Sequence, residues 1–87
     1  MTNERDLPAR MLRRYLDGAT PSEILHEVCA DRPNIPIPEL MILMESAFSL
    51  ELPDVSCIGG WEPDGTGELN DQQLDYFLTR SIEQKRA

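Results

Sequence analysis

Three prolines within six positions, Pro33, Pro36 and Pro38, interrupt the chain near its middle. Proline has no backbone N–H to donate, and its ring clashes with the preceding turn of a helix. Residues 31–38 are therefore expected to form an extended, semi-rigid connection. A second break lies over residues 54–68, which contain four of the five glycines. Regular structure is thus confined to short segments before, between and after these two breaks.

Within these segments apolar residues recur at helical spacing. A first helix is predicted over about residues 8–17, with Gly18 as its stop. The second begins at Thr20, because Thr20-Pro21-Ser22-Glu23 matches an N-cap, a first-turn proline and a capping-box glutamate. The third begins near Pro38 and is expected to be the central helix, since few of its positions are polar. Its apolar residues are Leu40, Met41, Ile42, Leu43, Met44, Ala47, Phe48 and Leu50.

The last helix is predicted to begin after Asn70, which can cap it, while Gln73 can complete the capping box. Its inner face is expected to hold Leu74, Phe77, Leu78 and Ile82. Pro53 is interpreted as closing the third segment, and residues 54–68 as a long loop that could include a short extended piece over residues 54–58.

The predicted fold is all-α, a compact bundle of about four helices with a long Gly/Pro-rich loop before the last helix. With 87 residues, the chain is expected to form a single domain over residues 1–87, with frayed ends at about 1–6 and 84–87. No apolar run approaches the roughly 18 residues that a membrane span needs. The start of the chain lacks the apolar core of a secretory signal, so we expect a cytoplasmic protein that keeps Cys29 and Cys57 as free thiols.

Charge is distributed very unevenly along the chain. Between Asp17 and Thr79 there are thirteen carboxylates and one basic residue, Arg32, while the other seven basic residues lie near the two ends. A concentrated negative field speeds association with a basic partner and repels nucleic acid and anionic membranes. We therefore expect a protein partner of basic character, with no direct nucleic-acid or membrane binding.

Two residues on the second helix, His26 and Cys29, are three apart and share a face, which would suit a metal site or a nucleophile–base pair. Cys57 adds a third donor, but the sequence has no second histidine and no pair of cysteines separated by two residues. Nothing in the sequence supplies the orienting and oxyanion groups that catalysis would need. We therefore expect no metal, no cofactor and no enzymatic activity.

Residues 62–73 resemble the calcium loop of an EF-hand. Positions three, six, eight and nine of that loop are represented by Asp64, Gly67, Leu69 and Asn70. Glu62 stands at the first position, and Gln73 replaces the bidentate glutamate at the twelfth. The preferred interpretation is a glycine turn that leads into a helix N-cap.

Residues 15–28 resemble a helix-turn-helix. The second of these helices carries acidic side chains and no basic one, so it would repel DNA. The cluster of Arg10, Arg13 and Arg14 is the one group that could hold nucleic acid, and a solvated helix face is the simpler interpretation.

Small, acidic, helical chains without catalytic residues resemble bacterial toxin-immunity proteins, such as those that protect against colicin nucleases or contact-dependent inhibition toxins. The resemblance rests on size, charge and helical content. The adjacent tyrosine pair of the colicin DNase immunity proteins has no counterpart, because Tyr15 and Tyr76 are isolated. The resemblance implies a protein that covers the nucleic-acid-binding or active site of a basic nuclease toxin.

The residues predicted to contact this partner lie around the second break and the start of the last helix, with Trp61 as apolar anchor. They are Glu51, Asp54, Trp61, Glu62, Asp64, Glu68, Asp71 and Asp75. Two alternatives stay open at the level of sequence. The indole of Trp61 can fold back onto the bundle. The chain can also be a regulatory or adaptor subunit that docks, or forms a homodimer, through Met41, Leu43 and Met44 of its apolar third helix.

Overall fold

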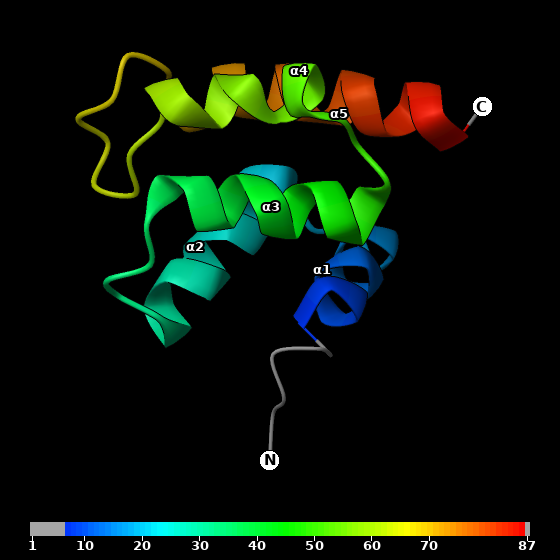
Figure 1. The fold of residues 1–87 in the computed structure, drawn as a ribbon, viewed down its shortest axis with the longest axis horizontal. Helices are drawn as coiled ribbons and strands as arrows, with labels where there is room; N and C mark the ends of the chain where they lie inside the picture. Colours follow the sequence, from blue (N-terminus) through cyan, green and yellow to red (C-terminus); the bar gives the residue numbers. More distant parts are fainter. Residues whose placement is uncertain (1–6, 87) are drawn as a thin grey trace.

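The computed structural model describes residues 7–86, and these form an all-α fold, as the sequence predicts (Figure 1). Within this range the chain forms five α-helices and one 3-10 helix, with an isolated bridge between Trp61 and Leu69 as its only strand-like pairing. The elements are α1 (Leu7–Leu16), α2 (Pro21–Asp31), α3 (Ile37–Phe48), α4 (Leu52–Val55), the 3-10 helix η2 (Ser56–Gly60) and α5 (Asp71–Arg86).

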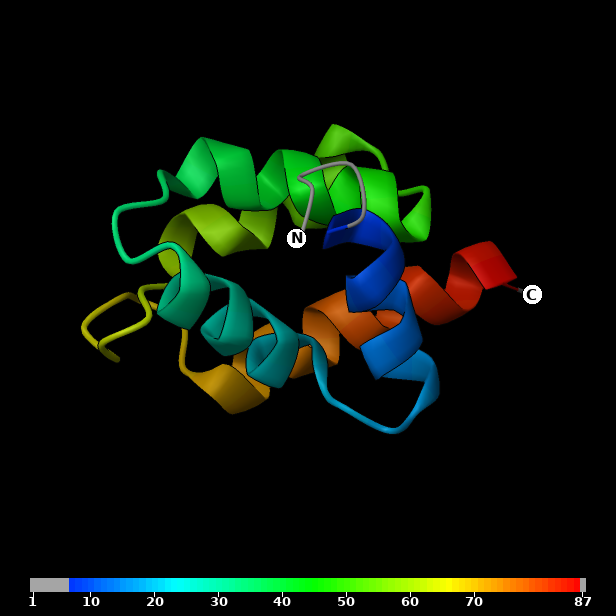
Figure 2. The same cartoon turned by 90° about the horizontal axis from the view of Figure 1, so that it is seen from below.

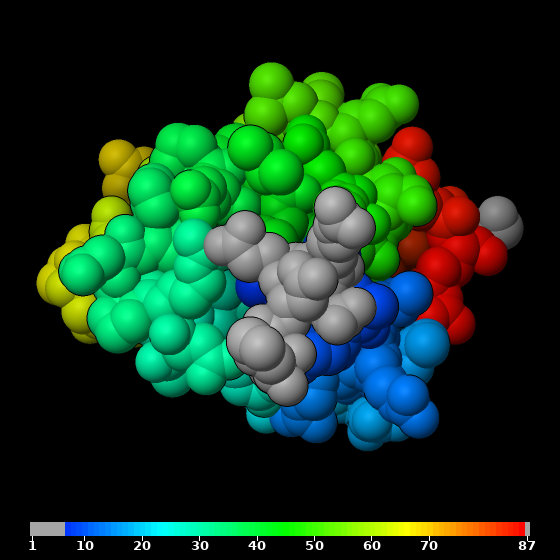
Figure 3. Space-filling view, turned by 60° about the horizontal axis from the view of Figure 1, so that its bottom comes forward, coloured from blue at the N-terminus to red at the C-terminus, as the bar shows by residue number. Residues whose placement is uncertain are grey.

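In Figure 1, α3 lies between α1 and α2 below it and α4 and α5 above it, but Figure 2 shows α3 along one edge of the bundle. The other helices therefore do not surround α3, as the prediction of a central helix requires. Helix α1 packs against α3, and α2 packs against α5. The connection from η2 to α5, residues 61–70, lies at one end of the molecule, and the C-terminal end of α5 lies at the other (Figures 1 and 2). The same two ends stand at opposite edges of the space-filling view (Figure 3). The last helix is thus long enough to connect two separate regions of the surface.

Local capping signals set the start of α2 as the sequence predicts. The hydroxyl of Thr20 accepts a hydrogen bond of 3.3 Å from the backbone N–H of Glu23, and the Glu23 carboxylate accepts one of 3.1 Å from the backbone N–H of Thr20. Pro21 occupies the first helical position, where its missing N–H costs nothing. This reciprocal cap fixes where the chain enters α2.

The sequence predicts one long loop over residues 54–68, with an extended piece at 54–58. This is wrong for residues 54–60, which are helical and belong to α4 and η2. Pro53 lies in the first turn of α4 and does not end a segment, because a proline in that position removes no helical hydrogen bond. Glu51 and Asp54 form a reciprocal cap around it. The bundle therefore has five α-helices where about four were expected, and the loop shortens to residues 61–70.

The core is built from the inner faces of all six elements, and α3 contributes most of its apolar side to it. Leu40 and Met44 are completely buried, and Met41 and Leu43 pack against the core while partly exposed. Ile42, with 61% of its surface exposed, is the large apolar residue of α3 that faces outward. Most apolar side chains of α3 are therefore fully or partly buried within this chain.

Helix α5 buries Leu74, Leu78 and Ile82 as predicted. Phe77, which was expected on the same inner face, is 45% exposed and lies beside the exposed Tyr76. Successive residues of an α-helix are rotated by 100° about its axis. Leu74, Leu78 and Ile82 occupy the side that faces the core, and Phe77 lies at the margin of that side. The helix continues to Arg86 and so includes residues 84–86 of the segment expected to fray, whereas residues 1–6 and 87 lie outside the described residues.

A side-chain hydrogen bond joins α5 to α1. The hydroxyl of Tyr15 on α1 donates to the carboxylate of Glu83 on α5, and burial together with this hydrogen bond raises the pKa of Tyr15 to about 12. The Tyr15 ring also packs edge-on against Phe48, with ring centroids 5.4 Å apart.

Among residues 7–86, no helix has the length and apolarity required to cross a membrane.

Candidate functional site

The loop that connects η2 to α5, residues 61–70, is the centre of the predicted binding site. The backbone N–H of Leu69 donates a hydrogen bond of 2.9 Å to the carbonyl of Gly60, which closes the base of the loop. Gly67 lies against this base so closely that a Cβ there would be 2.6 Å from the Gly60 carbonyl oxygen. Gly65 has a φ of 85°, a conformation that glycine adopts without strain. The glycines therefore make this loop a tight turn of defined shape.

Trp61 begins the loop, and the structure places its side chain in the core with 1% of its surface exposed. The indole N–H donates a hydrogen bond of 2.9 Å to Asp71, the first residue of α5. Its ring packs edge-on against His26 of α2, with centroids 5.1 Å apart. Trp61 therefore follows the alternative in which the indole folds back onto the bundle, and in this conformation it offers no surface to a partner.

Asp71 joins three elements through its carboxylate. One oxygen accepts the Trp61 hydrogen bond, and the other lies 3.1 Å from Nε2 of His26. The hydrogen bond from Trp61, followed by the one from His26, lowers the pKa of Asp71 below its ordinary value. The Asp71 side chain is still 54% exposed, so its charge also contributes to the surface.

Asp75, one turn further along α5, is mainly a structural residue. Its carboxylate accepts a hydrogen bond of 2.7 Å from the backbone N–H of Ser22 and one of 2.9 Å from the Ser22 hydroxyl. The N–H groups in the first turn of a helix have no partner inside the helix, so a carboxylate from α5 satisfies a donor of α2. Asp75 is partly buried by this contact and is the least available of the predicted acidic residues near the loop.

Four of the predicted carboxylates come together at the loop end of the molecule. Glu62, Asp64 and Glu68 are exposed in the loop, and Asp71 follows at the start of α5. We call these four residues the loop surface. The backbone N–H and hydroxyl of Thr66 donate to Asp64 at 3.0 and 2.6 Å, which shapes the turn and lowers the pKa of Asp64. A shallow depression of about 470 Å³ lies between this turn and His26.

The other two predicted carboxylates, Glu51 and Asp54, are not part of the loop surface. Glu51 lies 4.0 Å from Lys85 in the last turn of α5. With 16 residues, α5 is about 24 Å long, so Glu51 and Asp71 are near opposite ends of this helix. The Asp54 carboxylate accepts a hydrogen bond of 3.0 Å from the backbone N–H of Glu51. Residues that are neighbours in sequence thus divide into two separate surfaces.

The residues that resemble a calcium loop have other roles at its C-terminal end. Asn70 and Gln73 form a reciprocal cap, with Gln73 N–H donating to Asn70 at 2.8 Å and Asn70 N–H donating to Gln73 at 3.0 Å. The predicted N-cap of the last helix is therefore confirmed. Within residues 7–86, no group of three or more His, Cys, Asp or Glu side chains is placed to hold a metal ion.

The two cysteines are free thiols and are half-buried. Burial raises the pKa of Cys57, and burial together with the nearby charge of Glu62 raises the pKa of Cys29. A raised pKa favours the protonated thiol, which is a poor nucleophile and metal ligand. His26, the residue considered as a partner for Cys29, interacts with Asp71 and Trp61.

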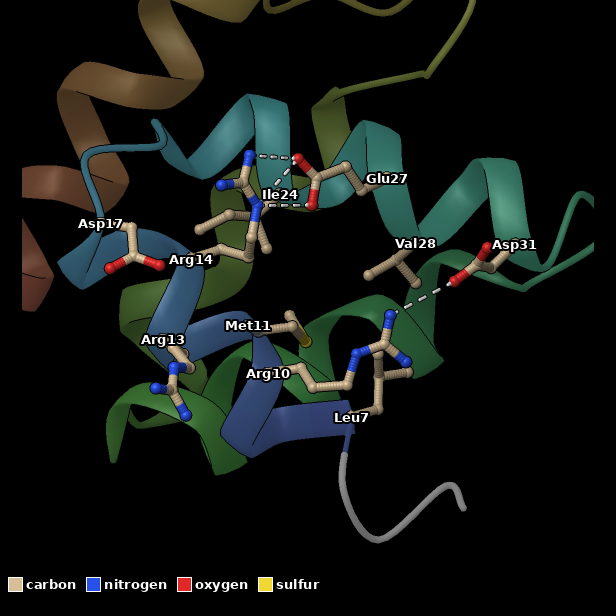
Figure 4. Close-up of a pocket in the computed structure, with 10 residues that line it drawn as sticks. All are labelled: Leu7, Arg10, Met11, Arg13, Arg14, Asp17, Ile24, Glu27, Val28 and Asp31. Atoms are coloured by element: carbon tan, nitrogen blue, oxygen red, sulfur yellow. Dashed lines mark hydrogen bonds and ion pairs between the residues drawn. The ribbon is translucent and has the colours of Figure 1, made fainter. Parts of the chain in front are cut away.

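A groove between α1 and α2 was not predicted from the sequence (Figure 4). It has a volume of about 180 Å³, an apolar floor that includes Met11 and Ile24, and charged side chains along its rim. Arg14 contacts Glu27 with nitrogen–oxygen distances of 2.8 to 3.2 Å, and this interaction raises the pKa of Arg14 and lowers that of Glu27. Arg10 faces Asp31 at 3.9 Å. Two of the three clustered arginines are therefore paired with carboxylates of α2, which reduces the positive charge available to bind phosphates.

The chain matches no protein-family model, no curated protein sequence and no solved structure.

Proposed function

We propose that this protein binds and neutralises a basic protein partner, and that the partner is a nuclease toxin whose nucleic-acid-binding or active site it covers, as an immunity protein does. The observation that carries the proposal is the loop surface, where four partly or fully exposed carboxylates lie within ten residues. The sequence has no lysine or arginine from Glu62 to Asp75. All the formally charged side chains in this stretch are therefore acidic, and they can attract a basic protein.

Electrostatic complementarity explains why such a surface suits a nuclease as target. A nuclease grips phosphates with lysine and arginine side chains, and carboxylates held on a protein can pair with the same side chains. Clustered charge also raises the association rate, because the field steers the partner before contact. The short loop, closed by Gly60 and Leu69, supports the proposal further, since pre-formed contacts lose little entropy on binding.

The proposed contact residues differ from the full predicted set. Glu62, Asp64, Glu68 and Asp71 remain as the binding surface. Trp61 and Asp75 act indirectly. Trp61 donates a hydrogen bond to Asp71, and Asp75 links α5 to α2 through Ser22. Glu51 and Asp54 lie apart from it. The adaptor alternative has less support, because Met44 is buried and Met41 and Leu43 are half-buried, which leaves α3 without a wide apolar face.

The first experiment is affinity capture of the tagged protein from its native cells at low and at high salt, with identification by mass spectrometry. We expect a basic protein that is retained at low salt and lost at high salt, because screening weakens exposed charge pairs. The captured protein, once purified, should degrade RNA or DNA and lose that activity when this protein is added. A salt-resistant complex with an acidic or neutral protein would contradict the proposal.

Two double variants with the same change in charge locate the surface. Asp64→Lys with Glu68→Lys reverses two charges of the loop surface, and Asp17→Lys with Glu51→Lys reverses two exposed charges elsewhere. We expect the first pair to abolish capture at low salt and the second to retain it. Equal retention by both would exclude the loop surface, and equal loss by both would show that only the net charge matters.

A further inference from the structure

The exposed aromatic pair on α5 has no role in the fold or in the proposed function. Tyr76 and Phe77 are 62% and 45% exposed, and their rings pack edge-on with centroids 5.6 Å apart. Leu52, at the start of α4, is 61% exposed. Three of the five large apolar residues that are exposed within residues 7–86 therefore lie on α4 and α5. Contiguous exposed apolar side chains, such as this aromatic pair, mark interaction sites.

An open groove of about 480 Å³ lies between α4, η2 and α5 beside this aromatic pair. We call it the α4–α5 groove; its lining residues include Pro53, Asp54, Cys57, Phe77 and Arg80, together with three small or amide side chains. No lysine or glutamate lines it. Phe77 and Arg80 belong to the residue types that are enriched in the buried centre of a protein interface.

The groove contains one cation and one anion, Arg80 and Asp54, and these do not pair with each other. Within residues 7–86, Arg80 has neither an ion pair nor a side-chain hydrogen bond. Asp54 accepts one hydrogen bond through a single oxygen, so the other oxygen can still accept. Arg80 and the second oxygen of Asp54 are therefore both available to pair with opposite charges on another molecule.

We propose that the α4–α5 groove binds a second copy of this chain in a two-fold symmetric dimer. In such a dimer the same patch faces itself, so that each contact between two different residues occurs twice. Arg80 of one copy then pairs with Asp54 of the second copy, and Asp54 with Arg80, while Phe77 and Tyr76 pack across the axis. One groove thus carries both partners of a reciprocal ion pair and an apolar centre.

The size of the molecule is compatible with this contact. A standard interface takes about 800 Å² from each partner, which is roughly one seventh of the 5560 Å² of accessible surface. The four residues of the loop surface do not line the groove, so the dimer leaves both acidic loops available. The proposal is therefore independent of the identity of any other partner.

Sedimentation equilibrium of the full chain tests the proposal. We expect the mass to rise with concentration from 9.9 kDa towards twice that value. The variants Phe77→Ser and Tyr76→Ser should weaken dimerisation at least tenfold, whereas Ile42→Ser should leave it unchanged. Ile42 is the matched control because it is 61% exposed and lies on α3. A wild-type chain that stays at 9.9 kDa at every concentration, or one that is affected only by Ile42→Ser, would overturn the proposal.

A charge exchange tests the reciprocal ion pair itself. Arg80→Glu and Asp54→Lys should each reduce self-association, because each places like charges across the axis. An equal mixture of the two should form a heterodimer, in which both contacts are again opposite in charge; native mass spectrometry with one tagged variant detects it. Circular dichroism shows whether Asp54→Lys folds, and Ser56→Lys in the same groove replaces it if it does not. A mixture of folded variants without heterodimer would rule out this geometry.

Discussion

Trp61 and Asp71 are joined by a hydrogen bond of 2.9 Å from the indole N–H to the carboxylate, and this contact closes the acidic loop over the core. The tryptophan begins the loop and the aspartate begins α5, so the bond holds together the two ends of the nine residues between them. His26 completes the arrangement from α2. A residue type that is typical of interfaces therefore holds the candidate interface in place from inside.

Truncation of this tryptophan should destabilise the protein strongly. Trp61→Ala removes a large buried side chain and the hydrogen bond to Asp71, and we expect a loss of about 3–5 kcal/mol in the free energy of unfolding. Urea denaturation followed by circular dichroism measures this loss. Ile42→Ala, at an exposed apolar residue on α3, should change the value by no more than about 0.5 kcal/mol. Similar stabilities for the two variants would contradict the buried position of Trp61.

The depressed pKa of Asp71 predicts how stability depends on pH. Because the pKa is lower in the folded state, the stabilising effect is complete above the unfolded value of about 3.9 and is lost as pH falls through the folded value. We therefore expect the urea midpoint of the wild type to fall more steeply below about pH 4 than that of Asp71→Asn. Parallel pH profiles for the two proteins would show that Asp71 is not linked to folding.

The contact between Asp75 and Ser22 should appear as an energetic coupling. Asp75→Ala leaves the Ser22 N–H at the start of α2 without its acceptor, and we expect a loss of about 1–3 kcal/mol. Ser22→Ala removes the hydroxyl contact alone and should cost about 1 kcal/mol. A double-mutant cycle by urea denaturation should give a coupling of at least about 0.5 kcal/mol. Simple additivity would show that the two side chains act independently.

Two glycines near the loop provide a matched comparison. A Cβ at Gly67 would lie 2.6 Å from the Gly60 oxygen and 2.7 Å from the Glu62 nitrogen, both backbone atoms that cannot move aside cheaply. Gly67→Ala should therefore destabilise the protein by about 1–3 kcal/mol. At Gly59 a Cβ would meet nothing within 4 Å, so Gly59→Ala should be neutral or stabilising by up to about 1 kcal/mol. Thermal unfolding of the two variants checks the order, and a tolerated Gly67→Ala would contradict the closed loop base.

Sequence reasoning was most successful where the signal was local. The caps at Thr20 and Asn70 depend on side chains that bond to backbone groups three residues away, so the start of α2 and of α5 could be predicted from short motifs. It failed where one residue type has two local meanings. Pro53 ends a helix in some contexts and begins one in others, and the reciprocal cap of Glu51 and Asp54 selected the second.

The sequence by itself determined the all-α class, the positions of the major helices and the concentration of negative charge, because periodicity, capping and charge are properties of short segments. Tertiary structure alone decided that Trp61 lies in the core, that Phe77 faces outward, and that the predicted carboxylates divide between the two ends of α5. These outcomes depend on which faces of distant elements meet. Asp71 touches Trp61 and His26 only because α2, the loop and α5 converge, and no local pattern encodes that convergence.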